Sequence, residues 1–153
     1  LGPITDIGDN AFSGCSLSEN VNFAFKTFSV KSSDSISFPE TLENIGAGSY
    51  SSCEKTEFVE IPRSVTSIKR GTFMNCIWLK SISLHSEIKS IEERAFYNCI
   101  NLNEISLPSN LESLEKYTFN YCTNLPSIEI PQGITAIEEG LFNRCTNLKS
   151  IRI

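Results

Sequence analysis

The chain has 153 residues, with 18 acidic and 13 basic side chains and a formal net charge of −5. This balance argues against partners that need a basic protein face, namely nucleic acids and anionic membrane surfaces. No apolar run approaches the ~18 residues of a membrane-spanning helix, so we expect no membrane insertion by this segment. Residues 1–15 already follow the motif described below, and we do not expect them to be a signal peptide.

Six cysteines divide the chain into copies of a single motif. Their positions are Cys15, Cys53, Cys76, Cys99, Cys122 and Cys145. The last five are spaced by 23 residues, whereas the first two are 38 residues apart. One copy reads Pro-x-x-Leu-x-x-Leu-x-x-x-x-Phe-x-x-Cys from Pro108 to Cys122, and apolar residues follow three, six and eight positions after the cysteine. A fixed period of roughly 20 to 29 residues with such a core predicts a leucine-rich solenoid.

The first copy ends at Cys15 and is followed by an irregular stretch at about residues 18–38. One interpretation is a truncated coil with strands around Asn22-Phe23 and Ser37-Phe38; the other is a loop inserted into one coil. We favour the truncated coil because both segments keep strand alternation, which would give the sheet seven strands. The stretch contains Phe25 and Phe28, which either fill a poorly matched coil or form a protruding apolar contact.

Every later copy has the same order of elements, with positions counted here from its cysteine. Apolar residues at +6 and +8 alternate with polar ones, which predicts a strand, and a proline at +9, replaced once by His85, ends it. A second apolar pair predicts a short segment that returns along the opposite side. The pairs are Val65 and Ile68, Ile88 and Ile91, Leu111 and Leu114, and Ile134 and Ile137. An aromatic residue at −3 anchors each coil, and asparagine at +2 predicts a turn with left-handed backbone.

These elements predict an α/β or mainly β repeat solenoid. We expect a curved right-handed coil with a parallel concave sheet and a 23-residue period, forming one domain over residues 1–153. No single coil buries its apolar side, so stacking at the ~4.8 Å strand spacing must build the core. Because Leu1 lies within a copy and Ile153 ends a strand, we expect the chain to be part of a longer protein. The open strand at 148–153 would allow end-to-end self-association.

The segment from Ile61 to Leu84, IPRSVTSIKRGTFMNCIWLKSISL, resembles the BspA-like, or Treponema pallidum-type, leucine-rich repeats, and so does Leu107 to Ile130. The resemblance extends over nearly the whole chain, with Ser18–Phe38 as the departure. It implies a surface or secreted protein of an anaerobic bacterium or a parasitic protist that acts in adhesion to host proteins or other cells. The family has no shared catalytic residue to carry over.

Residues that could carry chemistry are explained better by the repeat. His85, the only histidine, stands where other copies have proline, which predicts a solvated turn residue rather than a metal ligand or a catalytic base. Residues 46–50 (GAGSY) lack the lysine and the following helix of a phosphate loop. The carboxylate pairs Glu92-Glu93 and Glu138-Glu139 fall on the return segment, where we expect solvation. The sequence therefore predicts no enzyme activity and no cofactor.

The cysteines are expected to be buried, reduced thiols. An even number of cysteines would suit disulfides in a surface protein. Translation from coil to coil, however, makes neighbouring Cβ vectors parallel instead of convergent. A small apolar position suits a free thiol, and one cysteine per coil cannot provide a tetrahedral zinc site.

Strand alternation places positions +5 and +7 on the concave face, where serine is common. Such a face either is simply solvated or hydrogen-bonds a glycan or an extended peptide. A partner can be recognised specifically at positions where one coil differs from the others. We therefore expect a partner to contact Phe25, Phe28, Phe58 and Glu60, with Glu104 as a further candidate.

The function expected from these observations is a non-catalytic protein-interaction module. It would be the repeat region of a cell-surface or secreted adhesin, with host extracellular proteins or glycans as partners. Two alternatives stay open: an intracellular scaffold or regulatory subunit in the cytoplasm, and a repeat domain attached to an enzyme outside this chain. Reduced cysteines favour the intracellular alternative, whereas the family resemblance favours the surface protein.

Overall fold

The computed structural model describes residues 2–16 and 35–153. Within these ranges short β-strands are joined by turns, and no helix is long and apolar enough to cross a membrane. The strands are β1 (Asp6–Ile7), β2 (Ser35–Ser37), β3 (Asn44–Ile45), β4 (Phe58–Glu60), β5 (Ser67–Ile68), β6 (Ser81–Ser83), β7 (Ser90–Ile91), β8 (Glu104–Ile105), β9 (Ser113–Leu114), β10 (Ser127–Glu129) and β11 (Ser150–Arg152). The strand expected around Asn22-Phe23, and with it the count of seven strands, lies outside the described residues.

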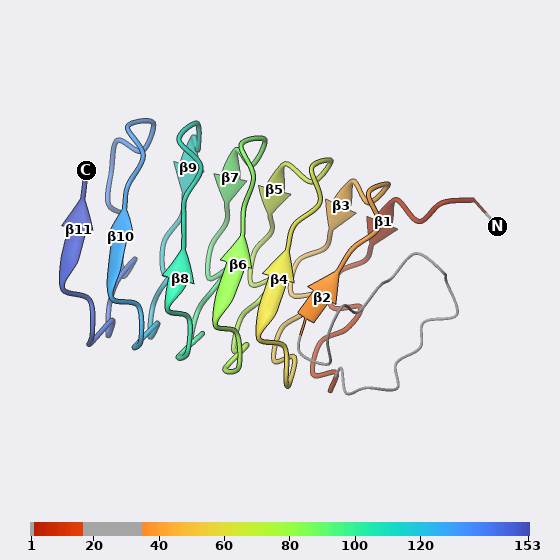
Figure 1. Ribbon diagram of the computed structural model, residues 1–153, viewed down its shortest axis with the longest axis horizontal. Coiled ribbons are helices and arrows are strands. Elements are labelled where there is room, and N and C mark those ends of the chain that lie inside the picture. The colour runs from red at the N-terminus through yellow and green to blue at the C-terminus, as the bar shows by residue number, and fades with distance from the viewer. Residues whose placement is uncertain (1, 17–34) are drawn as a thin grey trace.

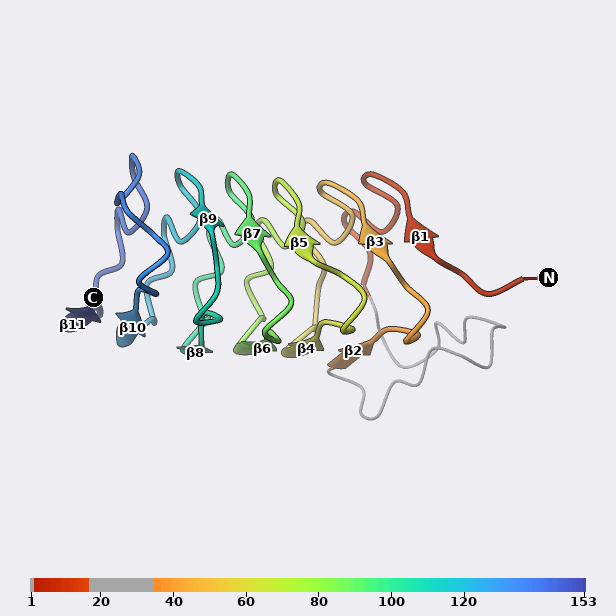
Figure 2. The same ribbon diagram turned by 90° about the horizontal axis from the view of Figure 1, so that it is seen from above.

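The strands form two rows, one on each side of the solenoid (Figures 1 and 2). On one side β2, β4, β6 and β8 form a four-stranded parallel sheet, and β10 pairs with β11. On the other side β1 pairs with β3, and β5, β7 and β9 form a three-stranded sheet. The register advances by one repeat per strand, so Phe58 lies beside Ser81, and Ser81 beside Glu104. The predicted 23-residue period and parallel sheet are confirmed, and the fold is mainly β.

A column of aromatic rings runs through the core. It is built from the residue at −3 of each coil, and Phe73, Phe96 and Phe119 are buried completely or nearly so. Successive ring centroids are 5.2–5.9 Å apart, and the rings of Phe73 and Phe96 are within 2° of parallel. Each ring is a translated copy of its neighbour, and ring pairs with centroids at this separation attract each other. The aromatic anchors predicted from the sequence therefore hold adjacent coils together.

The turn before each cysteine supplies a third set of hydrogen bonds between coils. In the coil that ends at Cys99, the N–H groups of Arg94, Phe96 and Asn98 donate to carbonyl oxygens of the next coil at 3.2, 3.1 and 2.7 Å. Arg94 and Asn98 have left-handed backbone, with φ of 56° and 58°. The asparagines at +2 do not, so the left-handed turn expected there is wrong. The chain turns before the cysteine. The asparagines at +2 connect coils through their side chains instead.

The strand ladder is interrupted between β8 and β10. At position +4 the backbone N–H groups of Lys80, Asn103 and Lys149 donate to the equivalent residue of the preceding coil at 2.8–3.0 Å. Pro126 occupies this position at the start of β10 and has no N–H to donate. The two strands do not pair, although the turns of the same coils stay connected, for example through the Tyr121 N–H at 2.8 Å.

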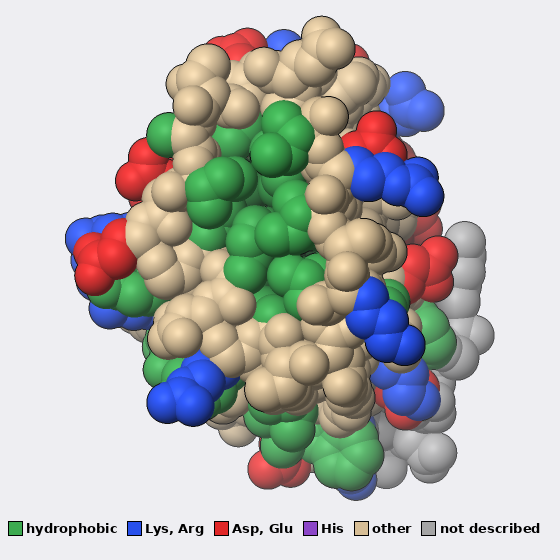
Figure 3. Space-filling model, turned by 90° about the vertical axis from the view of Figure 1, so that its left-hand side faces the viewer, with side chains coloured by type: hydrophobic (Ala, Val, Ile, Leu, Met, Phe, Trp, Pro, Cys, Tyr) green, Lys and Arg blue, Asp and Glu red, His purple; other side chains and the backbone are tan. Residues whose placement is uncertain are grey.

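The outer face of the last described coil, at β11, is apolar. Figure 3 views this end and shows hydrophobic side chains gathered at its centre. Ile137 and Ile151 are 53% and 43% exposed, whereas Ile91 and Ile128, at equivalent positions of inner coils, are 0% and 4% exposed. Of the pair expected to face inward, Ile134 is partly buried and packs against the core, but Ile137 is not covered. Ile137 is exposed because no further coil of the described residues stacks on it, whereas the equivalent Ile91 is covered on both sides.

Candidate functional site

The concave candidates stand on the four-stranded sheet. Phe58 and Glu60 flank the buried Val59 on β4, and Glu104 lies on β8. All three candidate side chains are exposed, as strand alternation predicts, and 45% of Phe58 is accessible. Ser81 lies between Phe58 and Glu104, so these two residues share one column two strands apart. Phe25 and Phe28 lie outside the described residues, and their contribution stays a prediction.

A hollow of about 700 Å³ opens on the concave side, where β8 and β10 are unpaired. Its polar lining comes from Ser106, Ser109, Ser127, Glu129, Gln132 and Arg152. Glu129 and Arg152 are register partners on β10 and β11, so opposite charges lie side by side at its margin. This hollow was not predicted from the sequence. The available signal was Pro126, at a position where other coils have a residue that can donate.

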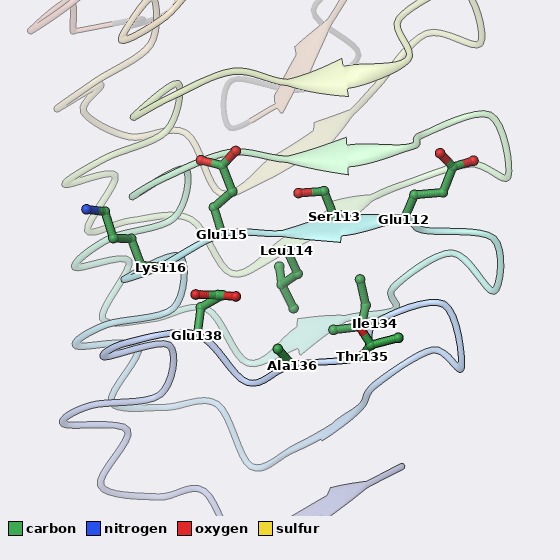
Figure 4. Close-up of a pocket in the computed structure, with 9 residues that line it drawn as sticks. All are labelled: Glu112, Ser113, Leu114, Glu115, Lys116, Ile134, Thr135, Ala136 and Glu138. Carbon is green, nitrogen blue, oxygen red and sulfur yellow. The ribbon is translucent and has the colours of Figure 1, made fainter.

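A second hollow, of about 300 Å³, lies on the opposite side between β9 and the return segment of the last coil (Figure 4). Glu115 and Glu138 come from equivalent positions of adjacent coils, with Lys116 beside them. Glu138 and Glu139 are exposed, as expected, but the Glu139 carboxylate also accepts a hydrogen bond from the Tyr117 hydroxyl. With Glu112 at its other end, the hollow is lined by three carboxylates and one ammonium group.

The carboxylates of the inner return segments have structural partners. The Glu115 carboxylate accepts a hydrogen bond from the Glu93 N–H at 2.8 Å, and the Glu92 carboxylate accepts one from the Arg70 N–H at 2.9 Å. The Glu93 side chain pairs with Arg94. The expectation that Glu92-Glu93 is a solvated pair is therefore wrong. Their side chains satisfy backbone and guanidinium donors at the edge of the stacked coils.

The other sequence candidates are also built into the coil. His85 Nδ1 accepts a hydrogen bond from the Glu87 N–H at 3.2 Å, and Nε2 lies 2.8 Å from the Pro62 carbonyl oxygen, which places the proton on Nε2. This half-buried histidine is thus more than a solvated turn residue. In the glycine-rich turn, the Ala47 N–H donates to the Asp9 carboxylate at 2.8 Å. A carboxylate there would repel phosphate, in agreement with the turn expected from the sequence.

The six cysteines are free thiols. The three innermost, Cys76, Cys99 and Cys122, are buried, and each Sγ donates to the carbonyl oxygen of the aromatic anchor one coil earlier at 3.0–3.2 Å. Burial raises the pKa of Cys53 to about 12 and that of Cys145 to about 11. This suppresses the thiolate, which is the reactive and metal-binding form. Among residues 2–16 and 35–153, no group of three or more His, Cys, Asp or Glu side chains could hold a metal ion.

The edge of the solenoid just after the cysteines presents aromatic and amide side chains. Trp78, 46% exposed, occupies position +2, where the next three coils have asparagine. The Asn124 amide donates to Asn101 at 3.1 Å, and that of Asn147 donates to Asn124 at 3.2 Å. Tyr121, 39% exposed, stands at −1 beside this row. Neither aromatic residue was predicted as a site residue, because both lie outside the strands. The available signal was the single tryptophan, at a position that is asparagine in the next three coils.

Comparison with known proteins agrees with the repeat and the fold. A family model described as the BspA type leucine rich repeat region matches residues 2–33 and 21–149, in 6 copies. A search of curated proteins finds no match.

Solved structures with the same fold cover nearly the whole chain. The Treponema pallidum leucine rich repeat protein is 25% identical, with a TM-score of 0.83 over 98% of this chain and 63% of its own. A leucine rich cell surface protein from Faecalibacterium prausnitzii is 28% identical, with a TM-score of 0.71 over 97% of this chain and 47% of its own. A leucine-rich repeat protein from Bacteroides ovatus is 29% identical, with a TM-score of 0.65 over 97% of this chain and 41% of its own.

This chain thus spans less than two thirds of the length of each of these three proteins. The 23-residue register, the aromatic and cysteine columns and the family match lead to one conclusion. The chain belongs to the BspA-type leucine-rich repeat family.

Proposed function

We propose that this chain is a non-catalytic protein-interaction module that acts at the cell surface or outside the cell, in the manner of an adhesin. The observation that carries the proposal is Phe58, a large exposed aromatic side chain on a sheet face of mostly small polar residues. Large side chains that can enter a partner's pocket provide binding hot spots. The stacked coils support this use because they present a long surface instead of an enclosed site.

The chemistry of the concave face indicates what a partner must offer. Glu60 follows Phe58 by two residues on the same strand and face, and Glu104 lies two strands away in the Phe58 column. A matching protein would place an apolar pocket over Phe58 and basic side chains opposite the two carboxylates. Phe25 and Phe28 of the irregular stretch stay part of the proposed contact, as the sequence predicts. The partner class proposed is a host extracellular protein.

The state of the cysteines is compatible with a location outside the cell. Free thiols usually indicate a reducing compartment. Here burial keeps the inner thiols protonated and each of them donates to a carbonyl oxygen, so they resist oxidation without a reducing environment. The Faecalibacterium prausnitzii neighbour is described as a cell surface protein. Both observations support the surface proposal over the cytoplasmic scaffold.

The decisive experiment screens the chain against an array of purified secreted and cell-surface proteins. Every saturable binder is then compared between Phe58→Ser and Ser127→Ala, with the melting temperature followed for both. We expect Phe58→Ser to weaken binding by at least about tenfold without lowering the melting temperature, and Ser127→Ala to change little. Absence of any saturable binder, or a binder insensitive to Phe58→Ser, would reject the concave site.

The non-catalytic part of the proposal has its own test. The purified chain should be inactive in hydrolase and transferase screens. An activity that disappears in His85→Ala would overturn it.

We also propose that the apolar end at β11 allows end-to-end association between copies of this chain. Ile151 and Ile137 are exposed there at positions that inner coils bury against a neighbour. Open strand edges with apolar side chains pair with other chains.

A further inference from the structure

We propose that the edge of the solenoid beside the cysteine column binds a neutral, extended glycan. This edge, called the amide edge below, consists of positions −1, +1 and +2 in four successive coils. Its residues are Asn75, Ile77, Trp78, Asn98, Ile100, Asn101, Tyr121, Thr123, Asn124, Arg144, Thr146 and Asn147. It is separate from the concave face of Phe58, so the proposal does not depend on the protein-binding function.

Trp78 supplies the platform on which a sugar ring would stack. It is 46% exposed, and it stands at a position where asparagine would continue the amide row. The row of asparagine side chains therefore ends at Asn101, whose side-chain amide donates to the Ile77 carbonyl oxygen at 2.7 Å. The π-face of an indole attracts the C–H face of a pyranose ring. The exposed Ile77 beside it widens the apolar platform.

The asparagines supply hydrogen-bonding groups in a fixed orientation. The amides of Asn101, Asn124 and Asn147 form a chain of hydrogen bonds at 3.1 and 3.2 Å. In this chain Asn124 uses one of its two N–H donors and one of its two acceptor sites, so one of each is left for a ligand. Asn124 and Asn147 are exposed. Donors and acceptors held in place in this way lose little freedom when they bind sugar hydroxyls.

Tyr121 adds a second exposed aromatic side chain to this edge. It has φ of 62° at position −1, where every other coil also has left-handed backbone, including Ser52 and Arg144. The turn of the repeat therefore sets this conformation, and it holds the tyrosine ring at the edge. The ring is held by an edge-to-face contact with Tyr97 at 5.9 Å and stays exposed. It stands two coils from Trp78, beside the asparagine row.

The ligand class follows from charge and spacing. From Asn75 to Asn124 the amide edge carries no charged side chain, although 20% of the chain is charged, and Arg144 is the single charge at its far end. A charged polymer would find no counter-charge along most of this edge. The amides repeat once per coil, at the ~4.8 Å spacing of stacked strands. An extended chain of β-linked hexoses advances by about one ring per coil and could meet the same groups repeatedly.

Tryptophan fluorescence tests the proposal directly, because Trp78 is the only tryptophan. The chain is titrated with cellohexaose and chitohexaose, and with glucose and N-acetylglucosamine at the same ring concentration. We expect a saturable blue shift with at least one hexasaccharide and a response at least about tenfold weaker with the monosaccharides, since several coils must be engaged. No saturable shift with either hexasaccharide, or a shift only with heparin or an unrelated peptide, overturns the proposal.

Substitutions to the residues of neighbouring coils separate binding from stability. Trp78→Asn matches position +2 of the next coils, and Tyr121→Asn matches Asn98 and relieves the left-handed tyrosine. Calorimetric titration should show at least about a tenfold loss of hexasaccharide affinity in each variant, with an unchanged or higher melting temperature. Phe58→Ser is the control and should leave glycan affinity unchanged. Full affinity in both edge variants, or a loss in Phe58→Ser alone, contradicts the proposal.

Discussion

The thiol of Cys99 donates a hydrogen bond to the carbonyl oxygen of Phe73, 3.1 Å away in the preceding coil. Cys122 and Phe96 are related in the same way at 3.2 Å. A thiol is a weak donor, but here it points at a carbonyl whose position the aromatic column fixes. The cysteine therefore fills a small apolar site and also connects two coils. A disulfide between neighbouring cysteines would require both thiols to give up these contacts.

The first prediction concerns thiol reactivity. Because the inner thiols are buried and their pKa values are raised, native protein should react slowly with iodoacetamide at pH 8. Protein denatured in urea without reductant should be labelled at all six cysteines. Intact mass spectrometry measures both. Two or more intramolecular disulfides in the intact mass would refute the thiol column.

The second prediction concerns alkaline pH. Burial keeps the Cys99 thiol protonated above its ordinary pKa of 9.0, while the same thiol in the unfolded chain ionises. The unfolded state therefore releases more protons as the pH rises above 9, and the free energy of unfolding should fall between pH 9 and 10.5. In Cys99→Ala this slope should be shallower by about 1 kcal/mol per pH unit. Equal slopes from urea unfolding would mean that the thiol is ionised or exposed in the folded protein.

The third prediction concerns the aromatic column. Phe96→Ala should lower the free energy of unfolding by about 3–5 kcal/mol, because the fully buried ring leaves a cavity between two neighbouring rings. Phe12→Ala, at the half-buried start of the column, should cost clearly less. Urea unfolding of both variants measures the difference. Equal costs would show that stacking between coils does not govern stability.

The sequence was sufficient to predict the parts of this fold that repeat. The 23-residue spacing predicts the parallel register, and the −3 aromatic residue predicts the core column, because translation gives every coil the same surroundings. The same logic failed for the asparagines at +2. Residue preference pointed to a left-handed turn, whereas the chain reverses earlier, at residues such as Asn98 and Tyr121.

The candidate sites were harder to predict because they depend on departures from the repeat. Strand alternation correctly placed Phe58, Glu60 and Glu104 on an exposed face. To predict the hollow next to Pro126, one must know that the missing backbone donor leaves two strands unpaired. To predict the amide edge, one must know that side chains at +2 of successive coils meet. Whether Phe25 and Phe28 join Phe58 depends on the irregular stretch, for which the repeat provides no register.

The fourth prediction concerns the interrupted sheet. Pro126→Lys restores an N–H at a position where Lys80 and Lys149 donate to the preceding coil. We expect β8 and β10 to pair and the free energy of unfolding to rise by about 0.5–1.5 kcal/mol. Amide exchange in residues 104–106 and 127–129 should slow at the same time. Pro131→Ala is the matched control, since its proline ends a strand, and it should lower stability by about 0.4–1 kcal/mol. Unchanged exchange around β8 in Pro126→Lys would show that the proline does not cause the break.

The fifth prediction concerns the apolar end. If two copies associate through this end, the sedimentation coefficient of the chain should increase with protein concentration. Ile151 is exposed on β11 at the position that inner coils bury, so Ile151→Glu places a charge in the contact and should give a monomer at all concentrations. Ser150→Glu adds the same charge on the concave side of the same strand and should still associate. A wild-type chain that stays monomeric at high concentration, or equal association of both variants, would contradict end-to-end stacking.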